Sequence, residues 1–497
     1  MVFPIPSVSD DTTAITRRRL LRWGATGSVA GLAGCALFEE TPFTVRSIWP
    51  STDLPNQSQP FDVEVRVRNE RPSEVRGEVV LRVNDEPAAS REVNLGPDQE
   101  RSVSLELAID EVGEHVIAAG DVQTVVRVRR FPPVFVGREG RHLTDGCAPV
   151  YLSGANNFLL TDPFLGEREL VDATMRTAAE IGFDVLRTWA FCAGQDGRCL
   201  QPEPETYDER AFSHLDYVIA SAKRHGIKLV PALVNNWGEL GGMDQYVEWS
   251  DTARRHDDFY TDEECRQLYR SFVETVVTRT NTITGLEYRE DPTIMMWNLA
   301  NEPRALSDPS GDTTHEWFAE MSEYLKSLDG NHLVTTGMEG FDVRDDWWSA
   351  EQGTDYVRSH ELEHVDVCSA HLHAGQWNLS LEESTEWIRS RTELAHETVG
   401  KPVYFGEFAF RPVDWKDYDG AGELLAARQD LFATWYDAFE SADVDCTLLW
   451  HFVARGSDRA QMDRPGFRWE HVIGDRDENV LELARSYDAR ASERSCL

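Results

Sequence analysis

From Val134 onward, short apolar runs alternate with amphipathic segments, and this alternation constrains the fold more than any other feature of the sequence. Each apolar run has the length of a fully buried strand, whereas most of the intervening segments have the 3.6-residue periodicity of a helix. Eight such strand–helix units in about 350 residues predict a (β/α)8 TIM barrel, an α/β fold, with elaborated loops. The predicted strands are Val150–Ser153, Val185–Trp189, Lys228–Val234, Thr293–Leu299, His332–Thr336, Val365–Ala370, Pro402–Gly406 and Cys446–Trp450, and the predicted helices include Leu215–Arg224, Cys265–Thr278, Trp317–Leu328 and Ala421–Phe439.

The segment 39–131 has a different pattern, in which apolar and polar residues alternate. Phe61, Val63, Val65 and Val67 are separated by charged residues, as in a strand with one solvated face. Further short strands with turn residues between them predict an all-β sandwich of immunoglobulin-like type. The segment contains no catalytic constellation, so we favour a spacer role over sugar binding. Phe131-Pro132-Pro133 forms the linker, and the barrel domain is predicted to cover 132–497.

Residues 1–38 are interpreted as a targeting segment and are left out of the fold prediction. Thr16–Arg22 resembles a twin-arginine export signal, and the apolar segment Trp23–Gly34 is too short to span a bilayer. Leu32-Ala33-Gly34-Cys35 resembles a lipobox, whose cysteine becomes acylated. We therefore expect export by the twin-arginine route and a lipid anchor at Cys35 on the extracellular face of the membrane, or secretion.

The formal net charge is −38, and the acidic residues are scattered over predicted helix faces. Only five lysines occur, whereas arginine is plentiful. An ordinary solvated surface would explain solubility but not the shortage of lysine, so we favour a halophilic source. A strongly negative field repels nucleic acid, which excludes nucleic acid as a partner.

Eight cysteines are present, and assigning Cys35 to the lipid leaves an odd number that cannot pair completely. Cys192 and Cys199 flank a short turn and are either bridged outside the cytoplasm or free; we favour the bridge. Cys368 and Cys446 lie in apolar runs and are predicted to be core residues. No Cys/His cluster has the spacing of a zinc site, so no metal and no cofactor are predicted.

Two glutamates follow predicted barrel strands. Glu302 lies in Trp297–Arg304, where Pro303 must end the strand because proline cannot donate to a strand ladder. Glu407 directly follows the strand Pro402–Gly406. Both are thus expected at the carboxyl ends of strands, where (β/α)8 barrels carry their chemistry. The alternatives are a simple turn at Asn301-Glu302-Pro303 and two structural carboxylates in ion pairs.

Carboxylates at the ends of strands four and seven resemble the catalytic pair of glycoside hydrolase family 5. The resemblance implies that Glu302 is the acid/base and Glu407 the nucleophile of a retaining reaction. In such a reaction the two carboxyl groups lie about 5–5.5 Å apart. Their environments must also keep them in different protonation states.

The resemblance extends to neighbouring positions. Arg187 would lie beside the nucleophile and hold Glu407 ionised, unless it forms a rim salt bridge. Asn301 would bond the sugar 2-hydroxyl, unless it caps a helix. His371 and Trp450 match a site histidine and the tryptophan that floors the catalytic subsite, although both residue types are common in cores. The chain departs from the family at His373, where the family has a tyrosine that hydrogen-bonds the nucleophile; His373 can supply an N–H instead, or the donor comes from elsewhere.

Within the family, the sequence most resembles the β-mannanases and their exo-acting relatives. We expect the substrate-binding residues to include Asn236 and the aromatic residues Trp189, Trp237, Trp377 and Trp450, whose rings can stack on sugars. The resemblance implies a retaining endo-β-1,4-mannanase acting on β-mannan or a related polysaccharide. The alternatives are an exo-β-mannosidase, a β-1,4-glucanase, or a non-catalytic surface carbohydrate-binding protein. The motifs that carry the resemblance are Gly154–Asn157, Val234–Trp237, Gly241-Gly242, Gln245–Val247, Thr278–Thr282 with Tyr288, and Gly337–Phe341.

Overall fold

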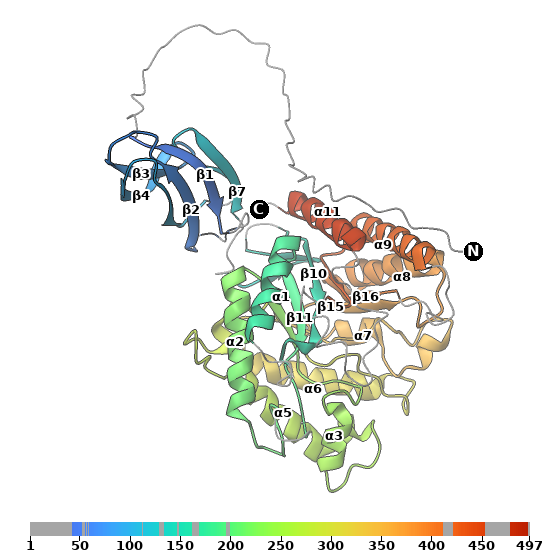
Figure 1. Ribbon diagram of the computed structural model, residues 1–497. Helices are drawn as coiled ribbons and strands as arrows, with labels where there is room; N and C mark the ends of the chain where they lie inside the picture. Colours follow the sequence, from blue (N-terminus) through green and yellow to red (C-terminus); the bar gives the residue numbers. More distant parts are fainter. Residues whose placement is uncertain are drawn as a thin grey trace, which may run out of the picture.

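The computed structural model shows a β-sandwich and a (β/α)8 barrel (Figure 1). It describes residues 42–51, 55, 57, 59–111, 113–128, 134–146, 149–161, 168–194, 199–410, 421–452 and 478–495. The predicted export signal, the anchor residue Cys35 and the linker 131–133 lie outside these residues.

The N-terminal module consists of two antiparallel sheets that share one apolar core. Inward-facing residues such as Val63, Val65 and Val67 are fully buried, while the charged residues between them are exposed, as the alternating pattern predicts. One sheet has the order β1-β2-β5 and the other β4-β3-β6-β7. The strands are β1 (Thr44–Pro50), β2 (Phe61–Arg68), β3 (Val75–Val83), β4 (Glu86–Leu95), β5 (Glu100–Leu107), β6 (Gly113–Ala119) and β7 (Val122–Val128).

Two strands of this module were not predicted from the sequence. In β1 a bulge between Val45 and Ser47 breaks the two-residue period. In β4 only Val93 and Leu95 are buried, so its first residues show no apolar alternation. Both strands are evident from their pairing with neighbouring strands and not from the pattern of their own residues.

The second module is built on eight parallel strands, which confirms the predicted barrel. The order β14-β13-β12-β11-β10-β17-β16-β15 closes on itself through a parallel bridge between Thr335 and Val367. β15 and β16 extend three residues beyond their predicted ends, because one extra residue in β16 shifts the register and the two strands continue to pair. The strands are β10 (Leu152–Asn156), β11 (Val185–Trp189), β12 (Lys228–Ala232), β13 (Met296–Asn298), β14 (Leu333–Thr335), β15 (Cys368–His373), β16 (Val403–Ala409) and β17 (Cys446–Leu449).

Helices surround the barrel, and Figure 1 shows α8, α9 and α11 side by side along one flank. The apolar faces of the helices bury large side chains such as Trp317 and Trp435 in the core of the barrel domain. The α-helices are α1 (Arg168–Ile181), α2 (Glu209–His225), α3 (Gly242–Trp249), α4 (Asp258–Thr261), α5 (Glu263–Val277), α6 (Asp312–Leu328), α7 (Tyr356–His360), α8 (Leu381–Glu393), α9 (Ala421–Ala442) and α11 (Glu478–Arg494); the 3-10 helices are η1 (Phe158–Thr161), η3 (Tyr288–Glu290) and η4 (Trp348–Glu351), and α8 continues into the π-helix η5 (Leu394–Val399).

A short hairpin, β8 (Gly137–Glu139) and β9 (His142–Thr144), closes the end of the barrel where the strands begin. Leu143 of this hairpin is fully buried in a cluster with Val185 and Met296 from the starts of the strands. The hairpin was not predicted, because three-residue strands give too short a pattern to recognise. Its Leu143 thereby adds to the apolar layer at the amino end of the barrel.

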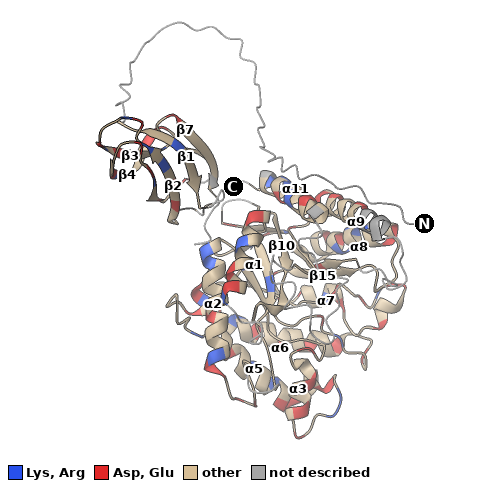
Figure 2. Ribbon diagram, in the orientation of Figure 1, with Lys and Arg blue, Asp and Glu red and all other residues tan. Residues whose placement is uncertain are grey.

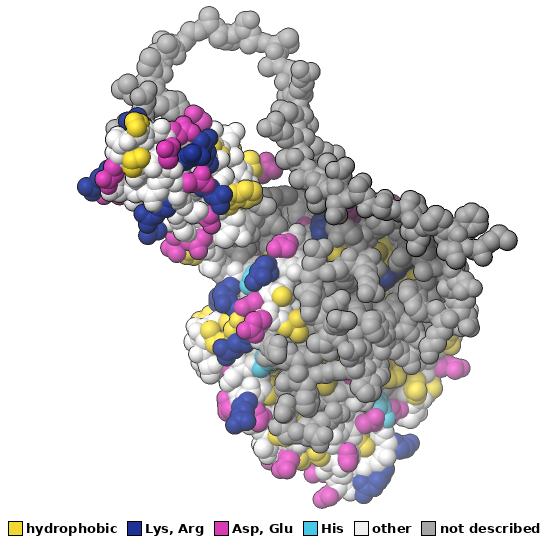
Figure 3. Space-filling view, in the orientation of Figure 1, with side chains coloured by type: hydrophobic (Ala, Val, Ile, Leu, Met, Phe, Trp, Pro, Cys, Tyr) yellow, Lys and Arg dark blue, Asp and Glu magenta, His cyan; other side chains and the backbone are white. Residues whose placement is uncertain are grey.

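The surface matches the acidic composition. Figure 2 shows acidic residues spread over the outer helices and the sandwich, and Figure 3 shows them interspersed with basic residues on the visible face. None of the described helices is long and apolar enough to cross a membrane. Cys192 and Cys199 form a disulfide, as favoured from the sequence, and Cys368 and Cys446 are buried with free thiols.

Candidate active site

Glu302 is held at the carboxyl end of β13 by backbone contacts to both neighbouring strands. Its own N–H donates to Gly337 O (3.0 Å), and the N–H of Asn301 donates to Val234 O (2.7 Å). The turn into Pro303 gives Glu302 a left-handed backbone with φ of 52°, which is unusual for a residue other than glycine. Gly337 is required beside it, because a Cβ at that position would lie 1.8 Å from Ala300 O.

Glu407 lies within β16 rather than after it, which corrects the predicted end of the strand at Gly406. The bulge between Phe405 and Phe408 shifts the register, so Glu407 pairs with His371 of β15. The same register places His373 opposite Ala409. The two histidines therefore point from β15 toward the same end of the barrel as Glu302 and Glu407.

These four side chains form one buried cluster, although they lie on three separate segments of the chain. His371 Nδ1 lies 2.9 Å from Glu302 Oε1, and His373 Nε2 lies 2.9 Å from Glu407 Oε2. His373 Nε2 also lies 3.5 Å from Glu302 Oε1. One donor or acceptor atom of each residue lies within 4.8 Å of the others. His373 Nε2 thus lies at hydrogen-bonding distance from Glu407, where the expected N–H donor would have to be.

Arg187 supplies the cation beside Glu407. Its Nη1 donates to Glu407 Oε1 at 2.7 Å, and the guanidinium is fully buried, so it is not a rim salt bridge. Its other N–H groups donate to amide oxygens of three asparagines, among them Asn301 at 2.6 Å. The amide groups therefore fix the guanidinium in the plane in which it meets the carboxylate. The three acceptors are Asn156, Asn298 and Asn301.

The electrostatics of the cluster centre on His373. Burial alone would lower the pKa of His373, but its hydrogen bonds to Glu302 and Glu407 and their charges raise it to about 10. Burial alone would raise the pKa of Glu302, but the hydrogen bonds and charges of His371 and His373 bring it well below its usual range. For His371, burial outweighs the neighbouring carboxylates and lowers the pKa. These shifts favour a protonated His373 beside an ionised Glu302.

Asn301, Asn236 and Trp237 surround Glu302. Asn301 is not a helix cap; its Nδ2 donates to Asn235 Oδ1 at 2.9 Å. Asn236 accepts the backbone N–H of Arg304 through its Oδ1 at 3.1 Å, so it shapes the turn after Glu302. Trp237 Nε1 donates to Glu302 Oε2 at 2.7 Å, and its ring is 41% exposed.

The other three predicted tryptophans lie nearby but differ in accessibility. Trp450 is half-buried and lies parallel to Phe158, with ring centroids 5.4 Å apart. Trp189 and Trp377 are only 4% and 8% exposed and contact other aromatic rings. Among the four, Trp237 presents the most open ring for stacking on a sugar. The sequence indicated these aromatic residues but not their burial, which depends on the packing of several loops.

Sequence reasoning assigned no role to Arg304 and Glu339, although both lie in motifs that we singled out. Arg304 donates two hydrogen bonds of 2.7 Å to the carboxylate of Glu339, and its guanidinium lies 5.1 Å from the ring centroid of Trp237. Burial, together with the charge of Glu302, raises the pKa of Glu339 to about 8 despite Arg304. This pair extends the polar site beyond the catalytic cluster.

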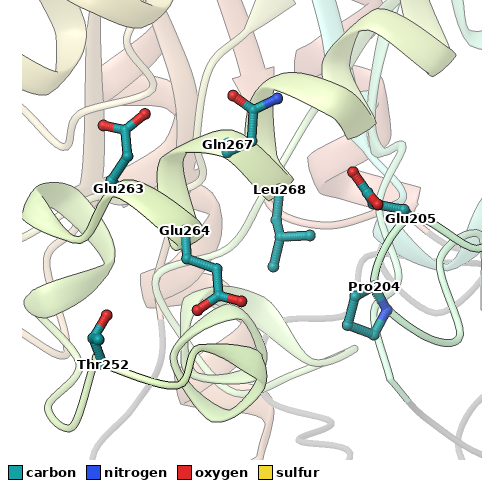
Figure 4. Close-up of a pocket in the computed structure, with 7 residues that line it drawn as sticks. All are labelled: Pro204, Glu205, Thr252, Glu263, Glu264, Gln267 and Leu268. Atoms are coloured by element: carbon teal, nitrogen blue, oxygen red, sulfur yellow. The ribbon is translucent and has the colours of Figure 1, made fainter.

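An open hollow of about 700 Å³ lies elsewhere on the barrel, between the loop after β11 and the start of α5 (Figure 4). It is lined by Pro204, Glu205, Thr252, Glu263, Glu264, Gln267 and Leu268. Glu263 is largely exposed and forms ion pairs with Arg266 and Arg270. Exposed, paired acids of this kind are suited to solvation and not to acid–base chemistry.

Comparison with known proteins places this geometry in a family. Residues 133–440 match the model of glycoside hydrolase family 5, described as β-mannosidase-like. The chain is 36% identical over 361 residues to mannan endo-1,4-beta-mannosidase 2 of Arabidopsis thaliana, which covers 68% of this chain and 82% of the relative.

Two solved structures are similar to the barrel. The endo-β-1,4-mannanase of Thermotoga petrophila matches with 32% identity and a TM-score of 0.61, over 69% of this chain and 77% of that one. The endo-1,4-β-mannanase of Rhizomucor miehei matches with 27% identity and a TM-score of 0.63, over 72% and 99%. The buried pair of glutamates at the ends of β13 and in β16 thus has the setting that the resemblance implied, and the chain belongs to glycoside hydrolase family 5 as a glycoside hydrolase.

Proposed function

We propose that the protein is a retaining endo-β-1,4-mannanase. The observation that carries the mechanism is the separation of the catalytic carboxylates: one oxygen of Glu302 lies within 4.8 Å of one oxygen of Glu407. Retaining glycosidases hold the two carboxyl groups about 5–5.5 Å apart, whereas inverting enzymes need about 6.5–9.5 Å to admit a water molecule between them. The short separation supports double displacement.

In the first step Glu407 attacks the anomeric carbon and forms an ester, while Glu302 gives a proton to the departing glycosidic oxygen. In the second step Glu302 takes a proton from water, which attacks the anomeric carbon and releases Glu407. Arg187 and His373 hold the attacking carboxylate through separate oxygens, at 2.7 and 2.9 Å. This leaves Glu407 a fixed orientation before the sugar arrives.

Glu302 must be protonated when it acts as an acid, whereas in the ligand-free protein the proton lies on His373. The two groups are close enough for a transfer, because His373 Nε2 is 3.5 Å from Glu302 Oε1. This transfer must precede the attack by Glu407, because Glu302 gives the proton away in the first step and must be ionised in the second step, when it accepts a proton from water. His373 therefore belongs to the acid–base system and not only to the support of the nucleophile.

The substrate proposal rests on the relatives, whose names state mannan as their substrate. A mannan site must accept an axial 2-hydroxyl, and an unpaired polar group at the wrong epimer costs about 1–3 kcal/mol. Asn301 and His371 lie beside the catalytic carboxylates and are the groups we assign to that hydroxyl. Trp237 and Trp348 are 41% and 37% exposed, so aromatic faces are available beyond the cleavage point, which favours an internal stretch of polymer.

The mechanism is tested with two variants and a surface control. Glu407→Ala should abolish turnover, and azide should restore part of it and yield a glycosyl azide of inverted configuration. Glu302→Ala should slow substrates with poor leaving groups far more than activated aryl glycosides. Glu205→Ala, in the open hollow, should change neither. Near-wild-type activity of Glu407→Ala would refute the assignment.

The substrate and the mode of action are tested on linear β-1,4-mannan in high salt. We expect a ladder of short oligosaccharides early in the reaction, with retained anomeric configuration by NMR. Release of mannose alone from chain ends would indicate an exo-β-mannosidase, and activity on cellulose but not mannan would indicate a β-1,4-glucanase. Binding of mannan without any turnover would favour the non-catalytic alternative.

A further inference from the structure

The catalytic cluster has the composition and geometry of a transition-metal site. Glu302, His371, His373 and Glu407 provide two carboxylates and two imidazoles, all of them buried. Nitrogen and oxygen ligands of these types are those that Zn²⁺ takes, usually four of them in a tetrahedron. We propose that this cluster binds one Zn²⁺-like ion, and that the ion inhibits the enzyme; the inhibitory part rests on the proposed function.

The distances fit such a site. With metal–ligand bonds of about 2.0–2.1 Å, the edges of a tetrahedron are about 3.3 Å long. Glu302 Oε1 lies 2.9 Å from His371 Nδ1 and 3.5 Å from His373 Nε2. Glu407 Oε2 lies 2.9 Å from His373 Nε2. These three distances link the four groups in a row, and one ligand atom of each group lies within 4.8 Å of the others, so small side-chain shifts would let a single ion contact all four.

The outer contacts orient the ligands toward that point. Trp237 donates to the other oxygen of Glu302, Oε2, and Arg187 donates to the other oxygen of Glu407, Oε1. The two oxygens nearest the histidines are thus left for an ion, as the partners of metal ligands commonly arrange. Binding of the ion displaces the proton of His373, because a histidine that ligates a metal must be neutral. Mg²⁺ and Ca²⁺ are poor candidates, because they require six or more ligands that are mainly oxygen.

The site arises from the departure that the sequence showed at position 373. Where the family has a tyrosine, whose hydroxyl is neutral at ordinary pH, this chain has an imidazole that can ligate a metal directly. We predicted no metal from the sequence, because the four residues spread over more than a hundred positions and have no zinc spacing. The fold brings them together for catalysis, and His373 completes the ligand set.

The described residues contain a second candidate, His142, His396 and Asp445, near the opposite end of the barrel. Both oxygens of Asp445 there accept backbone N–H groups, from Leu143 (3.0 Å) and Val403 (3.0 Å), in addition to the histidines. This carboxylate is committed to the fold, so the cluster is less able to turn toward an ion. It provides a matched control.

The test is calorimetric titration of the metal-free, full-length protein with ZnCl₂ at fixed salt, which does not depend on activity. We expect one tight site, and a loss of affinity of at least about 100-fold in His373→Gln and in Glu302→Gln, since even outer contacts of metal ligands are worth 10–100-fold. His142→Gln should bind as the wild type does. MgCl₂ should give no tight binding.

Three results would overturn the proposal: no tight site in the wild type, unchanged affinity in both cluster variants, or a loss confined to His142→Gln. Circular dichroism verifies that each variant is folded, and the two cluster variants change different strands, so misfolding of one does not remove the test. In parallel, Zn²⁺ should inhibit hydrolysis of mannan and EDTA should restore it. Tight binding without any mannan hydrolysis would leave the metal site standing and refute the proposed function instead.

Discussion

Replacing Arg187 by methionine should damage both the stability and the activity of the enzyme. Methionine has a similar length but no charge, so the buried carboxylate of Glu407 loses its cation. Removing one partner of a buried ion pair typically costs about 3–5 kcal/mol. Three amide oxygens lose their donor at the same time, so we expect a loss in the upper part of that range. Arg187→Lys should keep the ion pair but not the fork, at a cost of about 1.5–3 kcal/mol.

The effect on activity follows from the position of the nucleophile. Glu407 would be held by His373 alone, and a displacement of about 1 Å at a reacting group can cost about 100-fold in rate. We therefore expect kcat/KM to fall by at least about 100-fold in Arg187→Met, mainly through kcat, and by less in Arg187→Lys. Urea unfolding measures the loss of stability and hydrolysis of mannan measures the loss of activity, both at the same salt concentration in the molar range.

Arg279→Met is the matched control. Arg279 also holds a fully buried carboxylate, Asp216, through hydrogen bonds of 2.9 and 3.0 Å, but between α2 and the end of α5. It should lose similar stability and keep its kcat/KM. If Arg187→Met keeps kcat/KM within twofold, or if Arg279→Met loses as much activity as Arg187→Met, the positioning role of Arg187 is refuted.

The remaining predictions concern pH, salt and export. Burial lowers the pKa of His360 to about 3, so below pH 6.5 the unfolded chain binds a proton that the folded protein does not. As the pH decreases from about 6.5 to about 3, the free energy of unfolding should therefore fall by up to about 1.4 kcal/mol per pH unit. His360→Gln should flatten that slope in urea titrations, and an unchanged slope would contradict the reasoning. Because the Debye length reaches about 30 Å at 0.01 M salt, the acidic surface should destabilise the fold in dilute buffer and molar salt should restore it; equal melting temperatures would argue against a halophilic surface. Lysine in place of Arg17 and Arg18 should block export, and Cys35→Ser should release mature protein into the medium, whereas membrane retention of the Cys35→Ser form would disprove the lipid anchor.

Much of the barrel could be predicted, because a buried parallel strand is apolar along its whole length and is bounded by polar residues. β11, at Val185–Trp189, has the predicted bounds. The ends of β15 and β16 were predicted too early, since the pattern stops being apolar at the catalytic end while the pairing continues. The polar residues of the site therefore interrupt the apolar pattern, and this is why the ends of these strands could not be located from the sequence.

The burial and partners of the site residues could not be predicted in the same way. Trp377 and Trp237 have equal standing in the sequence, but one is packed under aromatic rings and the other is open. Arg304 and Glu339 come from the loops after different strands, and only the closed barrel shows that they bind each other. Residue type and strand end are local properties, whereas accessibility and pairing depend on the whole assembly.

The exchange at position 373 bears on the acid/base as well as on the nucleophile. A tyrosine adds no charge to the cluster, so Arg187 alone would face the two carboxylates, and one of them would have to keep a proton. With a protonated His373, two cations face two carboxylates, and the burial of the cluster no longer requires that proton on Glu302. The proton must then reach Glu302 when the substrate binds, over the 3.5 Å that separate it from His373. In the proposed mechanism, the imidazole that supports Glu407 is therefore also the source of the proton that Glu302 donates.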